Sequence, residues 1–242
     1  MPLRIVNVNV KARDDQALGR FWADALGWST DSEGPGVTSA YPDGLEWPDA
    51  SAVCIDAVTV PDPETVHYRV RIELAAESLE HRAALIERLL ALGATRVDAG
   101  FADPEGNVFR VQDPRPDESA TGPIGAIVLE CDHPRSQAAF WAAATDWVAV
   151  ERPEQRDQHD GPARLRSAVG VGPFVEFVEA PGVPAPSRFH IDLKPYAADD
   201  QSAEVSRLHS LGAVDTDLGQ GDSAWKCLAD PEGNDFCVLA AG

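Results

Sequence analysis

The pentapeptide Asp-Pro-Glu-Gly-Asn occurs twice in the chain, at residues 103–107 and again at 230–234. Aspartate suits the first position of a type I turn, proline presets φ at the second, and glycine follows at the fourth. A short apolar run follows each copy, so the pentapeptide predicts a turn within a β-hairpin and has a structural role. Its repetition indicates that the chain arose by internal duplication.

Other landmarks repeat at a constant spacing. Phe21-Trp22, Trp28 and Leu92-Gly93-Ala94 return 119 positions later as Phe140-Trp141, Trp147 and Leu211-Gly212-Ala213. The pentapeptides are 127 positions apart, so the second half carries eight extra residues before its turn. We therefore expect one strand of the first half to be shortened or missing. The duplication predicts two domains, at 1–114 and 124–242, joined by a proline-rich linker at 115–123.

Composition narrows the class of protein. The 242 residues include no apolar run long enough to span a membrane, and the first residues lack the pattern of a signal peptide. Four cysteines without CxxC spacing favour a reduced, cytoplasmic protein with buried thiols. A formal charge of −20 argues against nucleic acid and anionic membranes as partners. The charge is compatible with a cationic small molecule, and equally with an acidic surface that keeps the protein soluble.

Hydrophobic periodicity predicts two β–α units in each half. For the helix before Gly93 it predicts a buried stripe of Leu79, Ala83, Ile86 and Leu90. Residues 31–50 are expected to form a loop with one short strand at 37–41, and residues 151–162 a polar loop. Strands are expected at 3–10, 52–60, 66–74, 124–129, 165–171, 174–178 and 188–193, and two more flank the second pentapeptide. The first helix is expected to begin at an N-cap on Asp14 or Asp15, to bury a face between Leu18 and Leu26, and to end at Gly27. Further helices are expected at 78–92, with Ser78 at its start, 135–147 and 200–211.

The order of these elements resembles a known family. A strand, a Phe-Trp helix, the run from His190 to Leu193, a helix ending Leu-Gly-Ala and the final pentapeptide are similar to a glyoxalase-like domain. This is the vicinal oxygen chelate superfamily, which includes glyoxalase I, bleomycin-resistance proteins and extradiol dioxygenases. The resemblance implies an α+β fold of two tandem glyoxalase-like domains, each of paired βαβββ modules with curved mixed sheets around a cavity. In the family's enzymes the cavity holds a divalent metal on His, Gln and Glu, and in its resistance proteins it sequesters a drug without metal.

The positions that the resemblance assigns to metal ligands are mostly replaced. Two arginines stand there, and a permanently charged guanidinium repels a cation. His190 and Cys237 are the two that could bind a metal easily. The expected positions hold Asn7 and Ala126 on the first strands, Arg71 and His190 on the strands of the second modules, and Arg110 and Cys237 after the turns. We therefore predict no cofactor, with a divalent metal at His190 as the alternative.

His190 has two interpretations. It is a metal ligand or general base, or a histidine at a strand end that is hydrogen-bonded to a neighbour such as Asp192. Asp192 leaves the same face of the strand and could orient the ring. Glu73 repeats this acid beside Arg71, which suggests a structural role for the acid. Cys237 is likewise a soft-metal ligand or nucleophile, or a small core residue.

Side chains from both halves could meet in shared cavities if the two domains pair within one chain. The family's geometry would then join Asn7 and Asp56 to His190 and Cys237. A second cavity would join Ala126 and Glu176 to Arg71 and Arg110. Trp225 is either a pocket residue or a core residue. The remaining histidines, at 67, 81, 133, 159 and 209, are expected on the surface or in loops because they show no HxxxH or HExxH spacing.

Three functions remain open at this point. The leading hypothesis is a protein that binds a small molecule, with a cation favoured by the charge, in a metal-free cavity. The second is a metal-dependent lyase, isomerase or dioxygenase with its site around His190. The third is a non-catalytic interaction scaffold with a filled interior. The protein is expected to be a monomer with intramolecular domain pairing or a homodimer.

Overall fold

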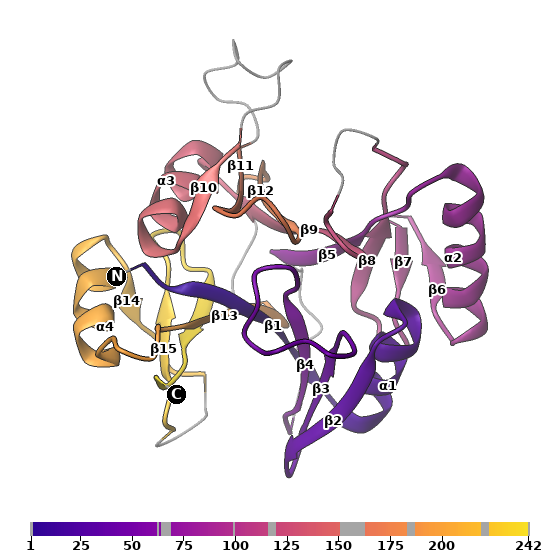
Figure 1. Ribbon diagram of the computed structural model, residues 1–242, viewed down its shortest axis with the longest axis horizontal. Coiled ribbons are helices and arrows are strands. Elements are labelled where there is room, and N and C mark those ends of the chain that lie inside the picture. The colour runs from indigo at the N-terminus through magenta and orange to yellow at the C-terminus, as the bar shows by residue number, and fades with distance from the viewer. Residues whose placement is uncertain are drawn as a thin grey trace.

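A computed structural model gives the arrangement of the chain in space (Figure 1). It describes residues 2–61, 63, 69–98, 100–115, 120–150, 163–182, 187–218 and 223–241. This part of the chain forms four α-helices and two eight-stranded sheets. None of the helices in these ranges is both long and apolar enough to cross a membrane.

The first sheet has the strand order β14-β15-β16-β13-β1-β4-β3-β2, and the second β10-β11-β12-β9-β5-β8-β7-β6. The strands of the first sheet are β14 (Val214–Asp215), β15 (Lys226–Ala229), β16 (Asp235–Val238), β13 (Phe189–Lys194), β1 (Arg4–Ala12), β4 (Cys54–Thr59), β3 (Val37–Tyr41) and β2 (Ser29–Gly34). Those of the second are β10 (Trp147–Ala149), β11 (Ala163–Ser167), β12 (Phe174–Glu179), β9 (Ile124–Cys131), β5 (Val70–Leu74), β8 (Val108–Val111), β7 (Gly100–Ala102) and β6 (Thr95–Val97). The helices are α1 (Asp15–Leu26), α2 (Leu79–Ala91), α3 (Pro134–Ala144) and α4 (Gln201–Ser210).

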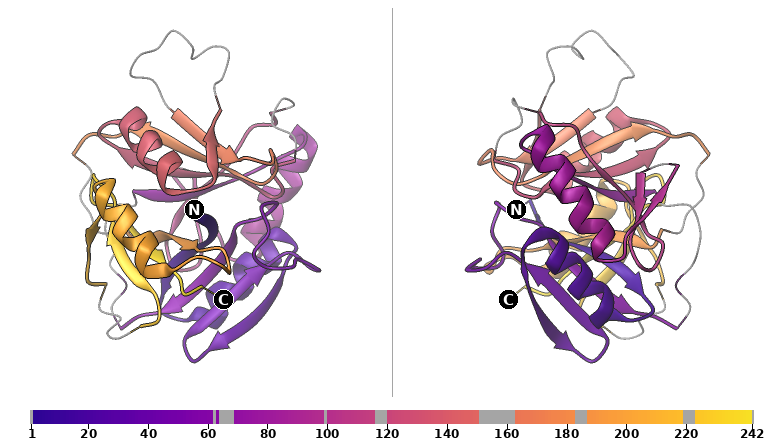
Figure 2. Two further views of the ribbon diagram at one scale, coloured as in Figure 1. Left: turned by 60° about the vertical axis from the view of Figure 1, so that its left-hand side comes forward. Right: turned by 90° about the vertical axis from the view of Figure 1, so that its right-hand side faces the viewer.

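Each sheet is shared by the two halves of the sequence. Strand β1 pairs antiparallel with β13 from the other half, and β5 pairs antiparallel with β9. Figure 1 shows the N-terminal β1 beside β13, and Figure 2 shows the second sheet lying above the first. The predicted pairing of domains within one chain is therefore observed as two sheets that each cross the duplication boundary.

The aromatic core, in contrast, is built within each half. Phe21 and Trp22 of α1 contact Phe109 of β8, with ring centroids 6.4 and 5.2 Å apart. Phe140 and Trp141 of α3 contact Phe236 of β16 in the same way, at 6.2 and 5.3 Å. Edge-to-face contacts of this kind add to the burial of apolar area. Hence aromatic contacts between α1 and β8 hold the first half together, and those between α3 and β16 hold the second. The sheets, in contrast, combine strands from both halves.

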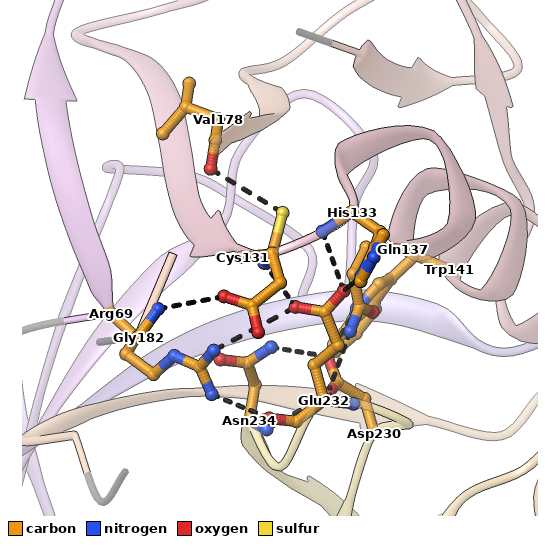
Figure 3. A network of polar contacts seen from close by, with 11 residues as sticks. Arg69, Cys131, His133, Gln137, Trp141, Val178, Gly182, Asp230, Glu232 and Asn234 are labelled. Atoms are coloured by element: carbon orange, nitrogen blue, oxygen red, sulfur yellow. Dashed lines mark hydrogen bonds and ion pairs between the residues drawn. The ribbon is translucent and has the colours of Figure 1, made fainter. Parts of the chain in front are cut away.

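The repeated pentapeptide forms the predicted hairpin turn. In the second copy the Asp230 carboxylate accepts hydrogen bonds from the backbone of Glu232 and Asn234 and from the Asn234 side chain (Figure 3). The Glu232 carboxylate accepts from the backbone N–H groups of Asp132 and His133, where α3 begins. The first copy repeats this network at the start of α1. The turn therefore joins the two modules of each half.

Several local predictions need correction. The strand expected to be shortened or missing in the first half is present and shortened, since β7 has three residues against four in β15. The extra residues of the second half belong to the connection between β14 and β15. The alternation of residues 3–10 predicts a half-buried strand, but β1 is buried on both faces. Strand β2 occupies part of the expected loop at 31–50. Residues 64–68 and the loop 151–162, with His67 and His159, lie outside the described residues.

The two middle helices also differ from expectation. The buried residues of α2 are Leu85, Ile86 and Leu89, whereas Leu79 is 74% exposed and Ala83 is exposed. Of the predicted stripe only Ile86 is buried, and Leu90 is exposed as well, so the buried face is centred on Leu85, Ile86 and Leu89. Helix α3 ends before Thr145, whose backbone is extended, and Trp147 already belongs to β10.

Candidate functional site

The polar face of the first sheet follows from strand alternation. Val8 and Val10 of β1 point into the core, so Asn7 and Asn9 leave the opposite face. On the neighbouring strand Asn7 pairs with Asp192 and Asn9 with His190. Ser39, Asp56 and Cys237 extend this polar face across β3, β4 and β16. Side chains from both ends of the sequence therefore meet on one surface.

A cavity of about 360 Å³ lies on the side of this face toward β3 and β4. We call it the Asp56 cavity. Its acidic residues are Asp31, Glu33 and Asp56, and its rings are Tyr41 and Trp47. The other lining residues are Asn7, Val37, Ser39, Leu45, Cys54 and Leu239. Of the four residues predicted to share one cavity, Asn7 and Asp56 line it, whereas His190 and Cys237 do not. Leu239 is contributed by the opposite half.

Asp56 is the best-connected acid of this cavity. Its carboxylate accepts hydrogen bonds from Asn7 Nδ2 at 2.7 Å and from the Ser39 hydroxyl. Asn7 in turn accepts a hydrogen bond from Trp47 Nε1 at 3.0 Å. Burial and the nearby charge of Asp192 raise the pKa of Asp56 to about 7, although both hydrogen bonds oppose this shift. Asp56 can therefore change its charge near neutral pH.

His190, Asp192 and Cys237 form a second group on the same face, which we call the His190 cluster. All three are buried, and their donor atoms lie within 4.8 Å of one another. His190 Nε2 is 3.3 Å from Asp192 Oδ1 and 3.5 Å from Cys237 Sγ. Asp192 thus contacts the same ring nitrogen as the thiol, and not the far nitrogen that an orienting acid would engage. The Asp192 Oδ1 atom is buried and has no hydrogen-bond partner among the described residues.

Cys227 adjoins this cluster from the next strand. Its Sγ lies 3.6 Å from Cys237 Sγ, and it is more exposed than Cys237. The hydrogen bond between the two thiols lowers the pKa of Cys227 and raises that of Cys237, which burial raises further. Of the two sulfurs, Cys227 therefore ionises more readily.

The equivalent face of the second sheet is filled by ion pairs. Arg71 contacts Glu73 at 3.2 Å and Glu130 at 2.6 Å. Glu73 also accepts a hydrogen bond from Gln112, so the structural role expected for this acid is supported. Arg110 is exposed and lies 3.9 Å from Glu73, while Glu176 pairs with Arg115 at 3.4 Å. Ala126 lies on the same face, packed with Val128 and Phe174. Arg71 and Arg110 therefore share Glu73, whereas Glu176 pairs with Arg115, and the predicted cavity that joins all four residues stays a prediction. Guanidinium groups do not suit a metal cation.

Other predicted residues are placed as follows. Trp225 is 37% exposed and lines a surface hollow beside α4, away from the Asp56 cavity. His81, His133 and His209 are exposed, as expected. Sequence reasoning missed Trp47, Tyr41 and Cys227. The alternation of Val37, Ser39 and Tyr41 was the signal that could have found one side of the cavity.

Comparisons with known proteins agree with this architecture. The model of the glyoxalase-like domain matches the chain twice, at residues 7–112 and 126–239. A search of curated proteins finds no match. Glyoxalase I from Zea mays has a TM-score of 0.67 at 14% identity, over 99% of this chain and 92% of that one. A candidate dioxygenase from Bacillus subtilis has a TM-score of 0.63 at 14% identity, over 99% and 86%. The chain therefore belongs to the glyoxalase-like domain family, with one copy of the domain in each half.

Proposed function

We propose that the protein binds a small organic cation in the Asp56 cavity. The volume of about 360 Å³ lies in the range of small-molecule sites. Three acids line it, and no lysine, arginine or histidine does among the described residues. The formal charge of −20 adds a long-range attraction for cations.

The observation that carries this proposal is the environment of Asp56. Its carboxyl group is held in place by Asn7 and Ser39. Burial makes the ionised form costly in the free protein and raises its pKa to about 7. A bound cation would compensate that cost, so the charge of Asp56 and the charge of the ligand would stabilise each other.

The aromatic rings of the cavity support the same ligand class. Organic cations are attracted to the faces of tryptophan and tyrosine. The ammonium of Lys194 already lies 4.9 Å from the ring centroid of Trp47, so a ligand cation would have to use the Tyr41 ring or displace this lysine. Val37, Leu45 and Leu239 provide apolar contacts for the carbon skeleton.

Matched ligand pairs test the proposal by calorimetry and thermal shift. Choline and its uncharged isostere 3,3-dimethylbutan-1-ol lead a panel of quaternary ammonium compounds and neutral analogues. We expect the cations to bind at pH 8, and we expect Asp56→Asn to lower their affinity at least tenfold. Glu179→Gln removes the same charge from an exposed site on the second sheet and should leave affinity unchanged. Equal binding of the neutral analogues, or full affinity in Asp56→Asn, would refute the proposal.

A second candidate function rests on the His190 cluster. Imidazole, carboxylate and thiolate are suitable ligands for Zn²⁺ and related metals. The separations of 3.3 and 3.5 Å are close to those of neighbouring ligands around a tetrahedral ion with bonds of about 2.0 to 2.3 Å. Asp192 Oδ1, which is buried and accepts no hydrogen bond from the described residues, would gain a bond. The residues of this cluster therefore fit a divalent metal, and those around Arg71 do not.

A metal at this position would supply a Lewis acid for polarising an oxygen of a substrate. His190, Asp192 and Cys237 would hold it, and the cavity beside them would bind the rest of the substrate. This is the metal-dependent alternative that the family resemblance implies. The third hypothesis, a scaffold with a filled interior, is not favoured because the Asp56 cavity is present.

Elemental analysis of the purified protein, before and after incubation with Zn²⁺ and dialysis, separates the two candidates. The metal-dependent function requires about one metal per chain, lost in both His190→Ala and Cys237→Ser. Cys54→Ser is the matched control, since Cys54 is a buried thiol on the same face of the same sheet. Wild-type protein that retains no metal would eliminate the metal-dependent candidate and leave cation binding untouched.

A further inference from the structure

The second half contains a pair of thiols that face each other across two antiparallel strands. Cys227 of β15 and Cys237 of β16 are direct partners in the strand register. Their sulfur atoms are 3.6 Å apart. Directly opposite residues in such a pair have Cα atoms about 4.5 to 5.5 Å apart, within the range of about 4.4 to 6.8 Å found in disulfides. The backbone is therefore already placed for a disulfide, and rotation of the side chains is all that is needed.

We propose that Cys227 and Cys237 are a redox-active pair, which hydrogen peroxide converts into a disulfide between β15 and β16. The site is distinct from the Asp56 cavity and does not depend on either proposed function. It carries a covalent modification that neither cation binding nor metal binding requires.

The two thiols differ in solvent exposure, and this difference sets which of them reacts first. Cys227 is partly exposed and borders a surface hollow of about 500 Å³, together with Trp225 and Lys226. Cys237 is 2% exposed and lies behind it, against His190. A small oxidant therefore reaches Cys227 first, and Cys237 is the second thiol that closes the disulfide.

The reaction balances in two steps. The Cys227 sulfur attacks one oxygen of hydrogen peroxide, the O–O bond breaks, and the released hydroxide leaves as water with the thiol proton. This leaves a sulfenic acid on Cys227. The Cys237 sulfur then attacks the Cys227 sulfur, the S–O bond breaks and the S–S bond forms, and a second water leaves with the Cys237 proton. The two sulfurs lose two electrons in total, and the peroxide gains them.

The other cysteines provide an internal comparison. Cys54 lies on β4 and Cys131 on β9, in different sheets, and burial raises the pKa of each to about 12. Neither has a cysteine opposite it in its strand register. Oxidation should therefore be confined to the pair at 227 and 237.

Disulfide formation would change the His190 cluster. The Cys237 sulfur lies 3.5 Å from His190 Nε2 and would no longer be available as a thiolate. Oxidised protein would keep His190 and Asp192 as candidate metal ligands but lose the third. Peroxide would thereby act on the face of the sheet that also carries the Asp56 cavity.

Peptide mass spectrometry of the full-length wild-type protein tests the proposal. After a few-fold excess of hydrogen peroxide, the non-reduced digest should contain the peptides of Cys227 and Cys237 linked, with loss of two hydrogens. Dithiothreitol should separate them. The Cys54→Ser/Cys131→Ser variant keeps the pair and should behave like wild type. Linkage of any other cysteines, or unlinked peptides under conditions that oxidise Cys227, would overturn the proposal.

Single substitutions test the order of the steps. In Cys237→Ser, a sulfenic acid should accumulate on Cys227 and be trapped by dimedone. In Cys227→Ser, the buried Cys237 should remain unlabelled at the same peroxide dose. Dimedone labelling of Cys237 rather than Cys227 would contradict the order proposed here, and the wild-type map decides the disulfide itself even if a variant fails to fold.

Discussion

At the scale of single residues, Asp56 shows how burial sets the properties of the cavity. Its carboxyl group accepts hydrogen bonds from Asn7 and Ser39, which favour the ionised form. Burial and the charge of Asp192 outweigh them, so its pKa rises to about 7. An aspartate in an unfolded chain has a pKa of about 3.9. Between these values the folded protein holds a proton that the unfolded chain has released.

This difference predicts the pH dependence of stability. The stabilisation that protonated Asp56 adds to the folded state is fully present below about pH 4. The free energy of unfolding then falls as the pH rises to about 7 and is constant above that. Between pH 5 and pH 8 the loss should be roughly 2 to 3 kcal/mol. Asp56→Asn cannot ionise, so it should lose much less over the same interval.

Urea unfolding at pH 5 and pH 8 measures both proteins. Asp31→Asn is the control, because it removes a charge from an exposed position of the same cavity. Asp31→Asn should show the same change in unfolding free energy between pH 5 and pH 8 as the wild type. A wild-type slope that persists in Asp56→Asn would show that another group causes the pH dependence.

At the scale of elements, the two pentapeptide turns share their backbone hydrogen bonds to aspartate and glutamate but differ in their ion pairs. Glu105 accepts a hydrogen bond from Arg188 Nη2 at 2.9 Å, and Arg188 is fully buried. Glu232 lies 3.9 Å from the equivalent Arg69 guanidinium. A buried charge that loses its partner costs more than a loosely paired one. The equivalent glutamates should therefore contribute unequally to stability.

Glu105→Gln and Glu232→Gln form a matched pair of variants. Both keep an oxygen for the helix-start N–H groups and remove the charge. We expect Glu105→Gln to lose about 3 kcal/mol of unfolding free energy, and Glu232→Gln about 1 kcal/mol. Chemical denaturation at pH 7 measures the difference. Equal losses would mean that the ion pair with Arg188 adds nothing to the shared hydrogen bonds.

At the scale of the whole molecule, the two halves complete each other's sheets. Strands β1 and β5 of the first half pair with β13 and β9 of the second. We expect one chain to satisfy these strand edges, so the protein should be a monomer of 25.9 kDa. The covalent linker should therefore contribute little to the association of the two folded halves.

Cleavage within the linker tests this arrangement. A protease site inserted after Arg115 should allow the folded chain to be cut once. The two fragments should still elute together in size-exclusion chromatography with light scattering, and should separate only in denaturant. Fragments that part under native conditions would show that the crossed sheet contacts are weaker than expected. An uncut mass of twice the chain would show pairing between chains.

Much of the local structure could be predicted because it depends on neighbouring residues. The Asp-Pro-Glu-Gly-Asn turns, the helix caps at Asp14 and Ser78, and most strands follow from spacing and turn chemistry. The duplication predicted that each element has an equivalent. The predictions of buried residues were wrong where burial depends on the elements that pack against a helix or strand in space. Leu79 has the right spacing for a buried stripe but faces solvent.

The sequence by itself determined the repeated modules, the family and the polar character of His190, Asp192 and Cys237. Tertiary structure decided which of these modules pair and which side chains meet. Strand edges can accept any compatible partner, and the residues of β13 that pair with β1 lie 179 to 190 positions further along the chain. The proximity of Asp56 to Asn7, the contact of His190 with Cys237 and the pairing of Cys227 with Cys237 all follow from register between strands. The first two contacts join strands that are far apart in sequence, so their register depends on how the sheets pack. The register of Cys227 with Cys237 is set by the hairpin turn between β15 and β16.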